Sequence, residues 1–121
     1  MRECVEDRTY KMFEKSKRLN CVIDYIEKNY QNQITLDEIS KEAGFSKYHF
    51  TRFFKDMTGV TFLNYLNNFR ISKVENALAN TEISITHIAM KSGFKNIKTF
   101  NRVFKNINGC SPMEYRKRLI S

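Results

Sequence analysis

The side chains of this sequence best suited to chemistry are cations interleaved with aromatic rings. They are densest in GFSKYHFTRFFK, residues 44–55, where five rings, three fixed cations and a histidine share 12 positions. At about 100° per residue a helix divides this stretch. One side carries Phe50, Phe53, Phe54 and Met57, and the other carries Tyr48, Thr51, Arg52 and Lys55. Such a helix anchors itself by its rings and offers positive charge and hydrogen-bond donors to an anionic partner.

The same arrangement occurs twice in the chain, in residues 34–65 and 83–115. At an offset of 49, Ile34, Leu36, Ile39, Gly44 and Phe45 match Ile83, Ile85, Ile88, Gly93 and Phe94. One residue is then inserted, and at an offset of 50, Phe50, Arg52, Phe54, Lys55, Gly59 and Tyr65 match Phe100, Arg102, Phe104, Lys105, Gly109 and Tyr115. The chain therefore uses one supersecondary unit twice. The second copy predicts Phe100, Val103, Phe104 and Ile107 inside and Lys98, Asn101, Arg102 and Lys105 outside.

Each repeat predicts a helix, a turn containing glycine and a second helix, which is the helix-turn-helix arrangement. In the first, Thr35 and Glu38 form a capping box before an apolar stripe of Leu36, Ile39 and Ala43. The other predicted caps are Ser46, Ser84, Asn96 and Ser111, the last followed by Pro112. Gly44 and Gly93 supply the turns, and we expect Phe45 and Phe94, which follow them, in the core.

The pattern predicts an all-α fold of seven helices, with two helix-turn-helix subdomains joined by a long spacer helix. We expect a linker or N-terminal extension over residues 1–18, the first subdomain over 19–60 and a connecting helix over 61–79. The second subdomain then covers 80–121, and apolar spacing predicts the first helix over 19–30.

The charge is strongly asymmetric. The net charge is +8, and residues 95–121 hold seven basic and one acidic side chain, which is +6 of it. This field attracts phosphate, although a merely solubilising basic surface remains an alternative. The three cysteines are widely spaced, which indicates a reducing cytosol rather than a disulfide framework. No apolar run approaches the ~18 residues of a membrane span, and we expect no membrane partner.

The polar faces of the two second helices suit DNA. A major groove is about 12 Å wide and admits a helix, and Arg, Lys, Asn and Thr address base edges there. The connecting helix is about 28 Å long at ~1.5 Å per residue, and major grooves repeat every ~34 Å. One chain of this kind is expected to read two half-sites without dimerising.

Two other classes of function fit the sequence less well. A helical protein-interaction module with a basic surface for an acidic partner has no need of the same outward residues twice. An enzyme has no support: there is no phosphate-cradling glycine loop, nucleophile–base cluster or shared carboxylate pair. His49 and His87 have no partner at metal-ligand spacing. We therefore expect no cofactor and no metal.

The doubled pattern resembles the DNA-binding domain of the AraC/XylS family of bacterial transcription regulators, from about Leu19 to Leu119. The second repeat carries most of the family signature. It comprises IxxIAxxxGF over residues 85–94, then Phe100, Arg102, Phe104, Lys105, Gly109, Ser111-Pro112 and Tyr115-Arg116. Arg70 resembles an arginine that the family carries in its spacer helix.

The resemblance implies a role for each outward residue. Base readers would be Tyr48, Thr51, Arg52, Ile97, Lys98, Asn101 and Arg102. Residues at or near phosphate would be Ser46, Lys47, His49, Lys55, Asn96, Thr99 and Lys105. Simpler readings stay open for some of them: half-buried packing for Tyr48, a lone exposed aliphatic for Ile97 and solubility for the lysines.

The resemblance also implies partners. A sensor domain usually accompanies this domain in the family, and activation requires a surface for RNA polymerase. The first 18 residues read as the tail of a linker from a longer regulator, or as an extension of a stand-alone one. Whether a bacterial, cytoplasmic regulator of this kind acts as an activator or as a repressor depends on where its site lies in the promoter.

Overall fold

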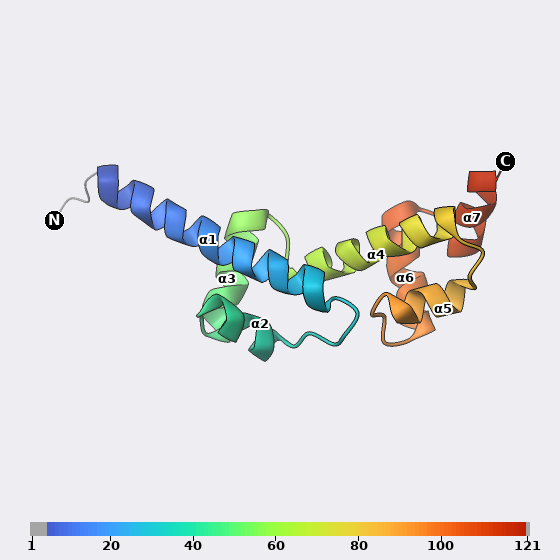
Figure 1. Ribbon diagram of the computed structural model, residues 1–121, viewed down its shortest axis with the longest axis horizontal. Coiled ribbons are helices and arrows are strands. Elements are labelled where there is room, and N and C mark those ends of the chain that lie inside the picture. Colours follow the sequence, from blue (N-terminus) through green and yellow to red (C-terminus); the bar gives the residue numbers. More distant parts are fainter. Residues whose placement is uncertain (1–4, 121) are drawn as a thin grey trace. The chain divides into compact units, whose positions relative to one another are not determined.

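The computed structural model describes the backbone of residues 5–120 and the side chains of residues 8–119. Seven α-helices make up this part of the chain, which contains no strand (Figure 1). They are α1 (Val5–Asn29), α2 (Leu36–Ala43), α3 (Lys47–Thr58), α4 (Phe62–Asn80), α5 (Ile85–Lys91), α6 (Ile97–Asn108) and α7 (Pro112–Ile120). The all-α prediction with two helix-turn-helix subdomains is confirmed.

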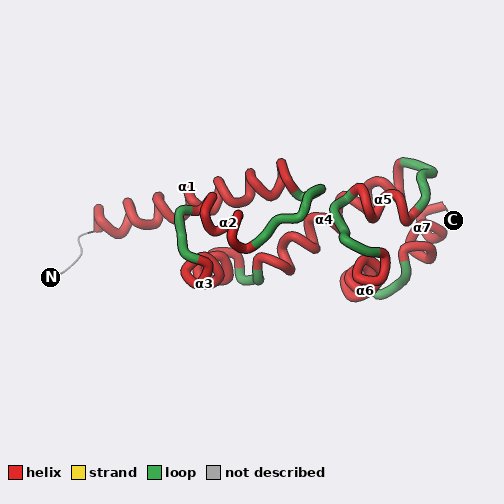
Figure 2. The backbone as a smooth tube through the Cα atoms, turned by 90° about the horizontal axis from the view of Figure 1, so that it is seen from below, coloured by secondary structure: helices red, strands yellow, loops and turns green. Residues whose placement is uncertain are grey.

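The chain divides into two compact units. The first holds α1, α2 and α3 and extends to residue 62, and the second holds residues 30–33 and everything described from residue 63 onward. Figure 2 follows the short loops that separate the helices within each unit. The helix α4 serves as the connection and also supplies Ile71, Val74 and Leu78 to the core of the second unit.

The predicted start of the first helix, at Leu19, is wrong. The helix α1 begins at Val5, so that it is 25 residues long. Between Arg8 and Lys17 this helix buries no side chain, and Tyr10, Met12 and Phe13 are exposed. This part of the helix contains Lys, Glu, Arg and Met, which favour a helix, but its apolar residues form no stripe, so apolar spacing predicts the helix only from Leu19 onward.

The core of the first unit is aromatic. Phe50 and Phe54 of α3 are fully buried with Val22 and Ile26 of α1. The ring of Phe62 meets both buried phenylalanines edge-on, with ring centroids 5.8 and 6.0 Å away. These contacts fix which side of α3 faces inward.

The second unit repeats this solution with α4 in the role of α1. Phe100 and Phe104 of α6 are fully buried beside Val74. Phe94 and Tyr115 close the aromatic row, with centroids 5.2 and 5.4 Å from Phe100 and Phe104 respectively. The inward face of α6 is therefore fixed as firmly as that of α3.

The helix starts are capped as the sequence predicts. The side chains of Thr35, Ser46, Ser84, Asn96 and Ser111 each accept a hydrogen bond from the backbone N–H three residues later. Each cap satisfies one of the donors that a helix start leaves unpaired.

Three core predictions fail. Leu36 is 38% exposed, because it is the first residue of α2 and lies at the edge of the unit. Phe45 is only half-buried, with the Arg18 guanidinium 4.7 Å from its ring centroid. Ile107 is 41% exposed, because it lies in the last turn of α6, beyond the aromatic core. None of the helices over residues 5–120 combines the length and apolarity needed to cross a membrane.

Candidate nucleic-acid interface

The outer face of α3 carries the polar side chains predicted for the first repeat. Tyr48 is 72% exposed, and Thr51, Arg52 and Lys55 are also exposed. Phe50, Phe53 and Phe54 on the other side are buried. The expected division of this helix is therefore confirmed, and half-buried packing of Tyr48 is not what the structure has.

The start of α3 brings together the residues predicted to lie near phosphate. Ser46 Oγ accepts the His49 backbone N–H at 3.2 Å, and the His49 ring lies against Phe45 with centroids 5.3 Å apart. Lys47 Nζ is 3.3 Å from Asp37 Oδ1 of α2, an exposed ion pair. The amides of a helix start and the exposed lysine are groups that bind phosphate oxygens.

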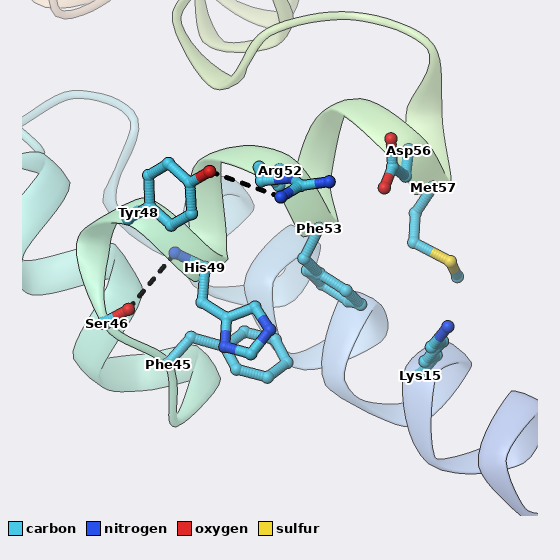
Figure 3. A pocket seen from close by; sticks show the side chains of 9 residues that line it. All are labelled: Lys15, Phe45, Ser46, Tyr48, His49, Arg52, Phe53, Asp56 and Met57. Carbon is cyan, nitrogen blue, oxygen red and sulfur yellow. Dashed lines mark hydrogen bonds between the residues drawn. The ribbon is translucent and has the colours of Figure 1, made fainter.

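One turn of α3 links two of the predicted base readers. Arg52 Nη1 donates to Tyr48 Oη at 3.3 Å, and its guanidinium carbon lies 5.7 Å from the tyrosine ring centroid. Figure 3 shows both side chains on the rim of a groove that continues past Phe53, Met57 and Lys15 of α1. The tyrosine therefore holds the arginine at a defined place on the helix surface.

The outer face of α6 matches that of α3. Lys98, Asn101, Arg102 and Lys105 are exposed, and Ile97 is 37% exposed. A shallow groove beside them passes from the start of α5 to the start of α7.

The start of α6 is built on an asparagine. Asn96 Oδ1 accepts the Thr99 backbone N–H at 2.8 Å, the shortest of the five cap hydrogen bonds, and Thr99 is half-buried. Each predicted set of site residues thus lies on or beside one helix of its own unit.

A profile described as a helix-turn-helix domain matches residues 39–118, about two thirds of the chain. A probable AraC family transcriptional regulator from Rhodopseudomonas palustris is 25% identical to this chain, with a TM-score of 0.75 over 85% of this chain and 97% of its own. The chain belongs to the AraC/XylS family and corresponds to the DNA-binding domain of that family.

Two further matches are to a transcriptional regulator and to a DNA-binding domain. An uncharacterized HTH-type transcriptional regulator of Staphylococcus aureus is 36% identical over 99 residues, which are 82% of this chain and 13% of the relative. The chain thus spans about an eighth of the length of that relative. The DNA-binding domain of AdpA, solved in complex with a target DNA, shares the fold with a TM-score of 0.76 and 24% identity, covering 80% of this chain and 87% of its own.

Within each unit, arginines bind backbone carbonyl groups of the loops, a role that the sequence pattern did not predict. Arg70 is 6% exposed, and it donates to the carbonyl oxygens of Tyr30 at 2.9 Å and Asn32 at 2.8 Å. Burial lowers the pKa of its guanidinium from the usual value, yet an arginine stays charged in proteins. A signal for this role exists in the sequence, because Arg70 continues the i, i+4 row of Leu66 and Val74.

Two further arginines act in the same way. Arg18 donates to the carbonyl of Ala43 at 2.9 Å, next to the first turn. Arg116 donates to the carbonyls of Ile83 at 2.7 Å and Thr81 at 3.0 Å, before α5. These guanidinium groups position the turns of the AraC-type domain rather than its outer faces. Within the described residues, no three His, Cys, Asp or Glu side chains gather as a metal site.

Proposed function

We propose that this chain binds double-stranded DNA sequence-specifically, with α3 and α6 entering major grooves. The observation that carries the proposal is the repeated outer face. Thr51, Arg52 and Lys55 on α3 have the counterparts Asn101, Arg102 and Lys105 on α6, and all six are exposed opposite buried rings. A surface that serves only solubility has no need of this repetition.

In this proposal Arg52 and Arg102 address guanine, since the guanidinium fork matches the O6 and N7 acceptors of that base. Thr51 and Asn101 address neighbouring bases, Tyr48 and Ile97 contact thymine methyl groups, and Lys98 reaches a base edge. The residues assigned to phosphate are Ser46, Lys47, His49, Lys55, Asn96, Thr99 and Lys105. Two grooves one helical turn apart, about 34 Å, form the full site.

The proposal extends to the regulator as a whole. The greater length of the Staphylococcus aureus relative leaves room for a sensor domain, and a regulator that activates transcription also contacts RNA polymerase. Both partners, and the bacterial cytoplasm as the place of action, belong to this proposal. Catalysis has no part in it.

The test compares matched variants on a duplex selected from a random pool and on a scrambled duplex. Arg52→Ala and Arg102→Ala should each weaken binding to the selected duplex by about 1–3 kcal/mol and relax the base preference at one position of the site. Lys55→Ala should weaken binding to both duplexes alike and reduce the salt slope of the affinity by about 1. If all three variants weaken binding to both duplexes equally, the base-reading roles are wrong.

A further inference from the structure

The two helix-turn-helix motifs differ sharply in charge although they share one pattern. From Leu36 to Thr58, α2 and α3 carry four basic and four acidic residues, a net charge of 0. From Ile85 to Asn108, α5, α6 and the turn between them carry five basic residues and no Asp or Glu, a net charge of +5. The ranges are equivalent in the repeat, so the difference is one of sequence and not of boundary.

Aligning the repeats locates the difference residue by residue. Asp37, Glu38, Glu42 and Asp56 of the first motif correspond to Thr86, His87, Lys91 and Asn106 of the second. Asp37 also lies 3.3 Å from Lys47, so the cation at the start of α3 already has a carboxylate beside it. A DNA phosphate meets a nearly neutral surface at the first motif and a strongly basic one at the second.

The residue one turn before the base-reading arginine also differs between the motifs, and here the first motif has the more favourable neighbour. Tyr48 accepts a hydrogen bond from Arg52 at 3.3 Å and lies under its guanidinium. The equivalent neighbour of Arg102 is Lys98, a like charge four residues away on the same helix. Like charges at this spacing repel, and an ammonium group cannot accept a hydrogen bond, so Lys98 cannot hold Arg102 as Tyr48 holds Arg52.

We propose that the two motifs divide recognition unequally. Arg52, positioned by Tyr48, supplies the larger share of base discrimination, and the basic α5–α6 motif supplies the larger share of the sequence-independent attraction to phosphate. This inference rests on the proposed DNA binding and specifies how its two halves contribute.

Both halves of the inference follow from general physics. Each phosphate neutralised by a cation releases counterions and adds about 0.9 to the salt slope of the affinity, so the first motif, with fewer unpaired cations, adds less than the second. A guanidinium already held loses less freedom on docking to a base. The hydrogen bond to Tyr48 uses one of the five N–H donors of the Arg52 guanidinium, and the others suffice for a bidentate contact with guanine.

The first experiment measures affinity against salt for two double variants of the full chain. Lys95→Gln with Lys105→Gln removes two cations of the second motif, and Lys47→Gln with Lys55→Gln is the matched control. We expect the slope to fall by about 2 for the second motif and by about 1 for the first, because Lys47 is paired with Asp37. Equal falls would overturn the charge half of the inference.

The second experiment uses the unsubstituted chain, so that it does not depend on how variants fold. Scrambling the half-site bound by α3 should remove most of the specificity and leave the salt slope almost unchanged. Scrambling the other half-site should cost less specificity. Arg52→Ala and Arg102→Ala identify which half-site is which. Equal losses from the two half-sites would overturn the unequal reading.

Tyr48→Phe tests positioning, because it keeps the ring and removes only the hydroxyl that holds Arg52. It should reduce the preference at the base pair read by Arg52 by about 2–12-fold, the worth of one hydrogen bond, with the salt slope unchanged. An unchanged preference would refute the positioning role. A chain that prefers no duplex over a scrambled one would overturn the proposed function itself, whereas preferred binding with equal halves overturns only this inference.

Discussion

The turn between α5 and α6 allows a sharp prediction at Gly93. Its backbone has φ = 103°, a conformation that favours glycine. A Cβ built there would lie 2.1 Å from the Tyr30 carbonyl oxygen and 2.6 Å from Arg70 Nε. Gly93→Ala must therefore displace the buried arginine or the loop that it holds. Gly109 is the matched control in the same unit, because it has φ = 73° and nothing within 4 Å of an added Cβ.

The magnitude follows from the contacts. Gly109→Ala carries only the cost of a left-handed conformation, about 1–2 kcal/mol. Gly93→Ala carries a similar backbone cost and also breaks the two hydrogen bonds of Arg70, each worth about 1.5–3 kcal/mol because the donor is charged. The sum, about 4–8 kcal/mol, is close to the whole stability of a small domain.

Urea unfolding followed by circular dichroism at 222 nm would measure both variants. We expect Gly93→Ala to lose the cooperative transition of the second unit, or to lower its free energy of unfolding by at least 3 kcal/mol more than Gly109→Ala does. If the two variants lie within about 1 kcal/mol of each other, the close packing of Arg70 against the turn is not what stabilises this unit.

Three further predictions concern stability. Phe54→Ala should cost about 3–5 kcal/mol through the cavity left by a fully buried ring, while Leu63→Ala, at a position 62% exposed, should stay within about 0.5 kcal/mol; chemical unfolding measures both. Asn96→Ala should cost about 1 kcal/mol by removing the cap of α6, and Asn96→Ser should restore most of it in a thermal melt. The Tyr25 hydroxyl donates a hydrogen bond to Glu38, which raises the pKa of Tyr25 above 10.0. The contribution of this bond to the free energy of unfolding should therefore be full below pH 10 and lost as pH rises through the raised pKa. Tyr25→Phe should flatten this pH dependence, and an unchanged alkaline stability profile would contradict the prediction.

The elements that the sequence predicted well are those set by local chemistry. Caps such as Ser46 and Asn96 act within one turn, so their spacing alone determines the hydrogen bond. The two faces of α3 and α6 follow from the 3.6-residue period, and the repeat gave each prediction a second, independent instance. The outward placement of Arg52 and Arg102 was predictable for this reason.

The elements that escaped prediction depend on contacts distant in sequence or on none at all. Arg70 can be buried because carbonyl groups nearly 40 residues away accept its hydrogen bonds, and a charged residue is otherwise expected at the surface. Between Arg8 and Lys17 the helix α1 buries no side chain, so no apolar stripe marks this segment. Ile107 shows the reverse case, in which the period is right but the core ends before the last turn of α6.

The most direct test of the proposed function is selection of the purified chain against a random duplex library at near-physiological salt, with sequencing of the bound fraction. We predict two short motifs at a fixed spacing of about one helical turn. We also predict that the motif lost in Arg52→Ala is the more sharply defined of the two. Binding without enrichment of any sequence, and only at low salt, would contradict the account and favour a basic surface for an acidic protein partner.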